Sequence, residues 1–122
     1  MILADTSIWI DHFRSGSKEL RKYLNQGQIV IHPYITAELA LGSLQERTKT
    51  LALLDLLPHV QVAQLSEVRR MIEARRLYNL GIGLTDAHLI ASVFINPSTL
   101  LWTRDKGLRK AAEGLGIHAG LG

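Results

Sequence analysis

Short apolar runs alternate along this chain with longer stretches of helical period, and this alternation limits the fold more than any other feature. The runs are ILA at 2–4, QIVIH at 28–32, HVQVA at 59–63 and TLLW at 99–102, with a weaker one, GIHA, at 116–119. Runs that are this short and continuously apolar are typical of strands covered on both faces, as in parallel sheets. The pattern therefore predicts a small, mostly parallel sheet.

The stretches between these runs have the spacing of amphipathic helices. We expect helices at about 7–13, 17–26, 34–45, 46–57, 66–79, 85–95 and 105–114. Ser66 and Thr85 are the expected N-caps of two of them, and Pro58 ends the helix before it. Strands that alternate with helices indicate an α/β fold, here a three-layer sandwich whose helices flank the sheet.

Length and composition place the chain among compact intracellular proteins. It has 122 residues, and we expect one domain over residues 1–122. The absence of cysteine excludes disulfides and thiolate metal sites. No apolar run approaches the roughly 20 residues of a membrane span, and the N-terminus lacks the pattern of a cleavable signal. We therefore expect a cytoplasmic protein.

Seven of the eleven acidic residues have an ordinary structural explanation. Most lie three or four positions from a basic residue on the same helix, or in the first turn of a helix, where an anion is favoured. Such exposed pairs contribute a few tenths of a kcal/mol at most. These seven are Asp11, Glu19, Glu46, Asp55, Glu67, Glu73 and Glu113, of which Asp55 is ambiguous.

The other four acids fit ordinary roles less well. Asp5 and Asp105 each follow an apolar strand, where they could be N-caps, and Asp86 opens a helix, where the helix dipole could explain it. Glu38 lies about one turn into the helix after QIVIH and shares its face with apolar residues such as Ile35. An unpaired buried carboxylate there would cost several kcal/mol.

These four acids share one expected location. The carboxyl ends of parallel strands and the helices that follow them meet at one rim of the sheet. Carboxylates packed together without a cation repel one another and raise each other's pKa. An all-oxygen cluster suits Mg²⁺ or Mn²⁺. We therefore expect a metal site, with hydroxyls of Thr6, Ser7 and Thr103 to orient a carboxylate or a metal-bound water.

The charge of the chain is compatible with a polyanionic partner. The formal net charge is +3, but if four acids bind metal, fourteen cations face only seven other acids. Candidate contacts to the phosphates of such a partner are Arg14, and Arg104 and Lys106 near the expected site. Each of them could equally be a solvated surface charge. Phosphate contacts carry no sequence information, so they would not identify a target sequence.

The segments that carry the four acids resemble the PIN-domain ribonucleases, and within them the small VapC-type toxins of toxin–antitoxin pairs. They are DTSIWID at Asp5, AELALG at Glu38, TDAHLIAS at Asp86 and TRDKGLRKAAEGLGI at Asp105. The resemblance spans essentially the whole chain. It implies endonucleolytic cleavage of RNA that depends on Mg²⁺ or Mn²⁺, with these acids as catalytic and metal-binding residues. It also implies a homodimer and a small VapB-like antitoxin, through which the complex binds operator DNA.

Three other interpretations stay open. A phosphoryl-transfer enzyme also has an aspartate after its first strand, but the haloacid-dehalogenase pattern needs a second aspartate where Ser7 stands. A binding module could keep the fold and the acids without useful catalysis, and poor Mn²⁺ binding would favour it. A housekeeping RNA-processing nuclease would share the chemistry but would lack a neighbouring antitoxin gene.

Overall fold

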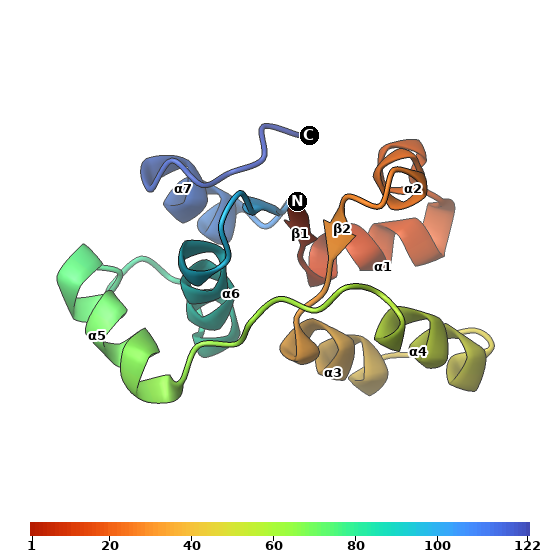
Figure 1. Ribbon diagram of the computed structural model, residues 1–122, viewed down its shortest axis with the longest axis horizontal. Coiled ribbons are helices and arrows are strands. Elements are labelled where there is room, and N and C mark those ends of the chain that lie inside the picture. The colour runs from red at the N-terminus through yellow and green to blue at the C-terminus, as the bar shows by residue number, and fades with distance from the viewer.

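The computed structural model describes residues 1–122 and has an α/β fold, with three parallel strands and seven helices (Figure 1). The strands are β1 (Ile2–Ala4), β2 (Ile29–Val30) and β3 (Leu100–Trp102). The helices are α1 (Thr6–Ser15), α2 (Lys18–Asn25), α3 (Pro33–Leu41), α4 (Arg47–Asp55), α5 (Leu65–Arg75), α6 (Leu84–Ile95) and α7 (Lys106–Gly114). None of these helices has the length and apolar content to cross a membrane.

The N-terminal strand is the centre of the sheet, whose order is β2–β1–β3. Leu3 pairs with Val30 on one side and with Leu101 on the other. Helices lie on both sides of the strands: in Figure 1, α1 to α4 are on the right and α5 to α7 on the left. Helix α1 packs on β1, and α6 packs on β3. The predicted α/β architecture is confirmed.

The two outer strands that the sequence suggested are each reduced to one bridge. Ile31 pairs with His59, and Leu101 pairs with His118, both in parallel orientation. Both segments lie at an edge of the sheet, where only one side can form hydrogen bonds. Within residues 59–63, only Val60 and Ala63 are buried. Few side chains there pack on the core, so the strand pairing does not continue beyond one residue.

All seven predicted helices are present, but several of their ends differ from the prediction. The third ends at Leu41, because Gly42 leaves the helical conformation. Helix α5 is capped by Gln64 and α6 by Gly83, so the predicted caps Ser66 and Thr85 are wrong. In both helices the acid three residues after the cap explains the earlier start. The backbone amide of Gly83, for example, donates to the Asp86 carboxylate at 3.2 Å.

The strands are held between the helices by one main core of 22 buried residues. Leu3, Leu101 and Trp102 from the sheet are fully buried, as is Ile90 from α6. Burial of such side chains supplies most of the favourable free energy of folding. The rim at which the strands end is therefore fixed by a rigid apolar layer beneath it.

We expect Leu3→Ala to lower the free energy of unfolding by about 2–5 kcal/mol, because it opens a cavity beneath the central strand. A suitable control is Leu56→Ala, since Leu56 is 81% exposed and its loss should change stability by less than about 0.5 kcal/mol. Urea unfolding followed by circular dichroism measures both. Equal effects of the two substitutions would contradict this description of the core.

Candidate metal centre

The structure brings the four singled-out acids to the rim formed by the carboxyl ends of the strands. Asp5 directly follows β1 and is the N-cap of α1, while Asp105 follows β3 and is the N-cap of α7. Asp86 lies in the first turn of α6, and Glu38 lies on α3, the helix after β2. The helix-capping explanations that the sequence left open for Asp5 and Asp105 are therefore real features of the fold.

Asp5 is the most tightly held of these acids. The backbone amide of Ser7 donates to Asp5 Oδ1 at 2.9 Å, and the Ser7 hydroxyl donates to the same oxygen. The hydroxyl of Thr103 donates to Oδ2 at 2.6 Å. Thr103 follows Trp102, the partner of Ala4 in the sheet, so strand register alone places this hydroxyl beside Asp5. Both carboxylate oxygens of Asp5 are thus oriented by neutral donors.

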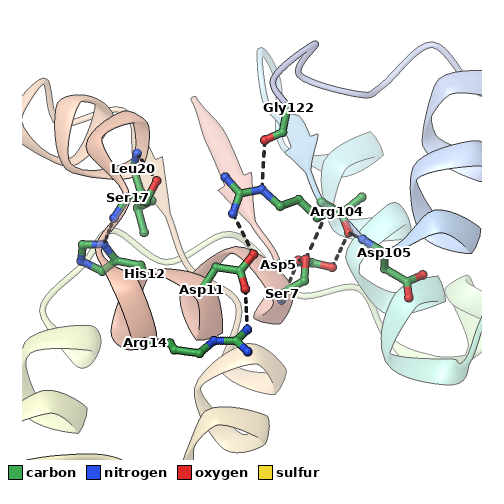
Figure 2. A network of polar contacts seen from close by, with 11 residues as sticks. Asp5, Ser7, Asp11, His12, Arg14, Ser17, Leu20, Arg104, Asp105 and Gly122 are labelled. Atoms are coloured by element: carbon green, nitrogen blue, oxygen red, sulfur yellow. Dashed lines mark hydrogen bonds and ion pairs between the residues drawn. The ribbon is translucent and has the colours of Figure 1, made fainter.

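The same two hydroxyls connect Asp5 to the loop between β3 and α7 (Figure 2). The backbone amide of Arg104 donates to Ser7 Oγ at 3.1 Å, and that of Asp105 donates to Thr103 Oγ1 at 3.0 Å. Each hydroxyl therefore accepts from one backbone amide and donates to Asp5. This relay fixes the separation of Asp5 and Asp105 without placing a cation between them.

The environment of Asp5 disfavours its ionised form. Burial raises the pKa of the Asp5 carboxyl, and the hydrogen bonds from Ser7 and Thr103 only partly oppose that effect. The ion pairs of the structure join Asp11 to Arg14, Asp11 to Arg104, and Arg109 to Glu113. None of them includes an acid of the rim, so the rim carries uncompensated negative charge.

Asp86 experiences the charge of the whole group. Its pKa is raised, first by burial and then by the negative charges of Asp105, Asp5 and Glu38. The hydrogen bond from Gly83 to Oδ2 opposes the shift, while Oδ1 accepts no hydrogen bond from the protein. Asp105 is similar, because Leu108 donates to its Oδ2 at 2.9 Å and its Oδ1 has no protein donor. Each side chain keeps one oxygen available.

Glu38 differs from its sequence-based description. The expectation that it shares a buried apolar face is wrong, because Glu38 is exposed and Leu41 on the same helix is 88% exposed. The outer side of α3 is not covered by another element at this point. Thr6 donates its hydroxyl to Glu38 Oε1 at 2.6 Å, which connects α1 to α3 at the rim.

The four carboxylates are suitable ligands for a hard divalent cation, but in this structure they do not converge on one ion position. All four side chains offer carboxylate oxygens, the ligands that Mg²⁺ and Mn²⁺ prefer. No three acidic or histidine side chains are close enough in this structure to bind one ion together. Asp5 is fixed by its donors, so an ion would have to draw the available oxygens of Asp86 and Asp105 toward it.

A second polar cluster adjoins the rim. Asp11 accepts from Arg14 Nη2 and from Arg104 Nη1, both at 2.8 Å, and these contacts hold the pKa of Asp11 below its usual value. Arg104 Nε also donates to the carbonyl of Gly122 at 3.0 Å. Figure 2 shows the Arg104 side chain directed toward Asp11 and away from Asp105. Lys106 is exposed and forms no ion pair.

Sequence spacing predicted the Asp11–Arg14 pair but not the Asp11–Arg104 pair, whose members are 93 positions apart. It also missed a cavity of about 720 Å³ beside Glu38, between α1 and the segment that joins α3 to α4. Phe13 and Arg14 of α1 line this cavity. Its far wall is an irregular loop, and no periodicity in the sequence indicates where such a loop will lie.

Comparison with known proteins agrees with the fold. The chain matches the PIN domain over residues 2–114. It is 41% identical over 117 residues to Ribonuclease VapC32 of Mycobacterium tuberculosis, in strain CDC 1551 / Oshkosh and equally in strain ATCC 25618 / H37Rv. The match covers 96% of this chain and 94% of each relative. The chain therefore belongs to the PIN-domain family and, within it, to the VapC-type ribonucleases.

Proposed function

We propose that Asp5, Glu38, Asp86 and Asp105 are the catalytic acids of this ribonuclease and that they bind Mg²⁺ or Mn²⁺. The observation that supports this proposal is the raised pKa of Asp86, which is due first to burial and then to the negative charges of Asp105, Asp5 and Glu38. No side-chain cation of the protein neutralises the group. A divalent ion bound there would relieve the repulsion that the fold leaves in place.

When bound, the ion would supply an activated water and would neutralise charge that develops on the scissile phosphate. The residues of the chain prepare this chemistry. Ser7 and Thr103 fix the orientation of Asp5, so little reorganisation is needed when the substrate arrives. Glu38, exposed at the edge of the site and held by Thr6, is placed to orient the attacking water and accept its proton. Asp86 and Asp105 contribute their available oxygens.

Binding of the RNA backbone is proposed for Arg14, Arg104 and Lys106. Arg14 and Arg104 share the single carboxylate of Asp11, so their cluster carries one net positive charge next to the acidic rim. Lys106 lies at the start of α7 next to Asp105 and has no acidic partner. An RNA strand could thus contact cations on both sides of the acids, while the scissile phosphate lies over the acids themselves.

The partners proposed are those of a toxin–antitoxin pair. We propose one nuclease domain over residues 1–122 that acts on cytoplasmic RNA, forms a homodimer, and is inhibited by a small VapB-like antitoxin that provides the contact with operator DNA. Exposed leucines support protein interfaces: Leu41 is 88% exposed, Leu53 57% and Leu56 81%. These side chains lie on α3 and at the end of α4.

We expect Asp5→Asn to remove metal-dependent RNA cleavage, with a loss of at least about 100-fold in kcat, because the substitution removes the best-positioned charge of the site. Asparagine still caps α1, so the fold should persist. The assay is cleavage of total cellular RNA with Mg²⁺, with Mn²⁺ and with EDTA. The matched control is Asp55→Asn, which changes an exposed acid at the end of α4 and should leave cleavage unchanged.

Full cleavage by the Asp5→Asn protein would contradict the proposed site. A wild-type protein that is folded and binds Mn²⁺ but cleaves no RNA would instead favour the catalytically weak binding module.

We expect Asp86→Asn to raise the melting temperature in EDTA at pH 7.5 by roughly 1–3 °C. The pKa of Asp86 is raised in the folded state, so its ionisation lowers stability as pH rises through that pKa. Asparagine removes the buried charge and its repulsion by the neighbouring acids, but it still accepts the hydrogen bond from Gly83. With Mn²⁺ the wild type should have the higher melting temperature, because only the wild type gains the full stabilisation by metal binding.

Differential scanning fluorimetry with and without Mn²⁺ measures both parts of this expectation. The advantage of Asp86→Asn in EDTA should disappear below about pH 3, where the wild-type carboxyl is protonated in both states. A variant that is less stable than the wild type in EDTA, or that gains as much from Mn²⁺, would show that Asp86 does not belong to a repulsive metal-binding group.

A further inference from the structure

The cavity beside Glu38 is continuous with the acidic rim. It has a volume of about 720 Å³, within the range of sites that accommodate small organic ligands. Its wall is formed by one face of α1, by Glu38 and Leu39 of α3, and by residues 42–46 of the following loop. Because Glu38 belongs both to this wall and to the proposed catalytic acids, a polymer bound at the rim would pass the mouth of the cavity.

The α1 side of the cavity offers an aromatic surface that is held in place. Phe13 lines the cavity and is 41% exposed. Its ring packs against Trp9, which is 3% exposed, with ring centroids 5.8 Å apart and planes tilted by 34°. The buried indole limits the movement of the Phe13 ring and leaves part of that ring accessible. An accessible, pre-oriented ring of this kind is what unpaired bases stack on in RNA-binding proteins.

The next residue of α1 provides a cation at the same place. Arg14 also lines the cavity, and its guanidinium is fixed by Asp11, which binds Arg104 through its other oxygen. The carboxylates of Glu38 and Glu46 elsewhere on the wall exclude a phosphate from those parts of the cavity. A ribonucleotide would therefore be oriented with its phosphate near Arg14 and its base directed inward along Phe13.

The loop on the opposite side supplies polar groups that the fold does not use. The side chains of Ser43, Gln45 and Glu46 line the cavity, and they form no hydrogen bond within the protein. Amide, hydroxyl and carboxylate groups can together donate to and accept from the edge of a base. Glu46 has a positive φ of 46°, an unfavourable backbone conformation for a residue other than glycine, and such residues are concentrated at functional sites.

We propose that this cavity binds the base of an unpaired ribonucleotide next to the scissile phosphate, with Phe13 as the stacking surface and Arg14 as the phosphate contact. The proposal rests on the proposed ribonuclease site, which determines where the strand runs. It assigns the occupant to RNA because an aromatic ring, a fixed guanidinium and free base-edge partners occur together beside the acids. The residues of the 42–46 loop would then determine which base is preferred.

The test measures RNA binding in EDTA, so that it does not depend on cleavage. The probe is a short, fluorescein-labelled single-stranded RNA of random sequence, titrated with protein and followed by fluorescence anisotropy. Phe13→Leu keeps an apolar side chain but removes the ring, and it should weaken binding on the order of tenfold. Phe13→Tyr keeps the ring and should stay within about twofold of the wild type. Phe94→Leu, at an exposed phenylalanine of α6 outside the cavity, is the matched control.

A second measurement locates the base. The same RNA with 4-thiouridine in place of uridine is irradiated on the wild-type protein, and the cross-linked peptide is identified by mass spectrometry. We expect the cross-link at Phe13 or at the adjacent loop, with Phe13→Leu reducing its yield. Equal melting temperatures of the variants would show that the fold is intact.

Unchanged RNA binding by Phe13→Leu would overturn the proposal, as would a wild type with no measurable affinity for RNA. Weaker binding by Arg14→Gln with normal binding by Phe13→Leu would also overturn it, because that result describes a phosphate contact without a base subsite. If Phe13→Leu binds RNA normally but loses affinity for the antitoxin, the cavity is a protein-binding groove. Loss of cleavage on Asp5→Asn with normal RNA binding would leave both proposals standing, since it concerns the acids alone.

Discussion

Burial of the Asp5 carboxylate at the carboxyl end of the central strand is the constraint on which the rest of the site depends. Asp5 ends the central strand, is buried, and is surrounded by hydroxyl and amide donors rather than by cations. A neutral residue could cap α1 at less cost in free energy, so capping alone does not explain a buried charge. The acid is explained if its charge binds a cation, as proposed above. Burial raises the pKa of Asp86 as well, and the neighbouring acids add to that shift.

The strand register explains why these groups meet although they are distant in sequence. Ala4 pairs with Trp102, so Asp5 and Thr103 are adjacent across two strands that are nearly one hundred residues apart. In the loop that follows β3, two backbone amides donate hydrogen bonds to the hydroxyls that bind Asp5. Local geometry is therefore determined by the sheet, and the apolar core beneath the rim keeps that geometry rigid. The same sheet that stabilises the fold would therefore also preorganise the proposed catalytic site.

Much of this organisation was predictable from the sequence. Continuous apolar runs separated by helical periods indicated the parallel sheet and all seven helices, and the placement of Asp5 and Asp105 after strands indicated the rim. Glu38 was misjudged because helical periodicity shows which residues share a face but not whether that face is covered. Two helices begin earlier than predicted, because Glu67 and Asp86 accept hydrogen bonds from the backbone amides of Gln64 and Gly83. A search for serine or threonine caps overlooks this kind of capping.

Other features could not have been read from local sequence. The pairing of Arg104 with Asp11 joins residues 93 positions apart and depends on how α1 lies against the loop after β3. The cavity beside Phe13 depends on the course of a loop that has no periodic pattern. Both features surround the acids with groups suited to an RNA strand: cations for its phosphates and an aromatic ring for a base. The proposed metal site and the proposed base-binding cavity would thus occupy neighbouring parts of one surface.

The most direct measurement is a crystal structure of the protein grown with Mn²⁺, with diffraction recorded at the manganese absorption edge. The account predicts an anomalous peak within about 2.5 Å of a carboxylate oxygen of Asp5 and of the side chains of Asp86 or Asp105, which should turn their available oxygens toward the ion. A well-diffracting crystal with no peak at this rim, or with a peak only at another part of the surface, would contradict it.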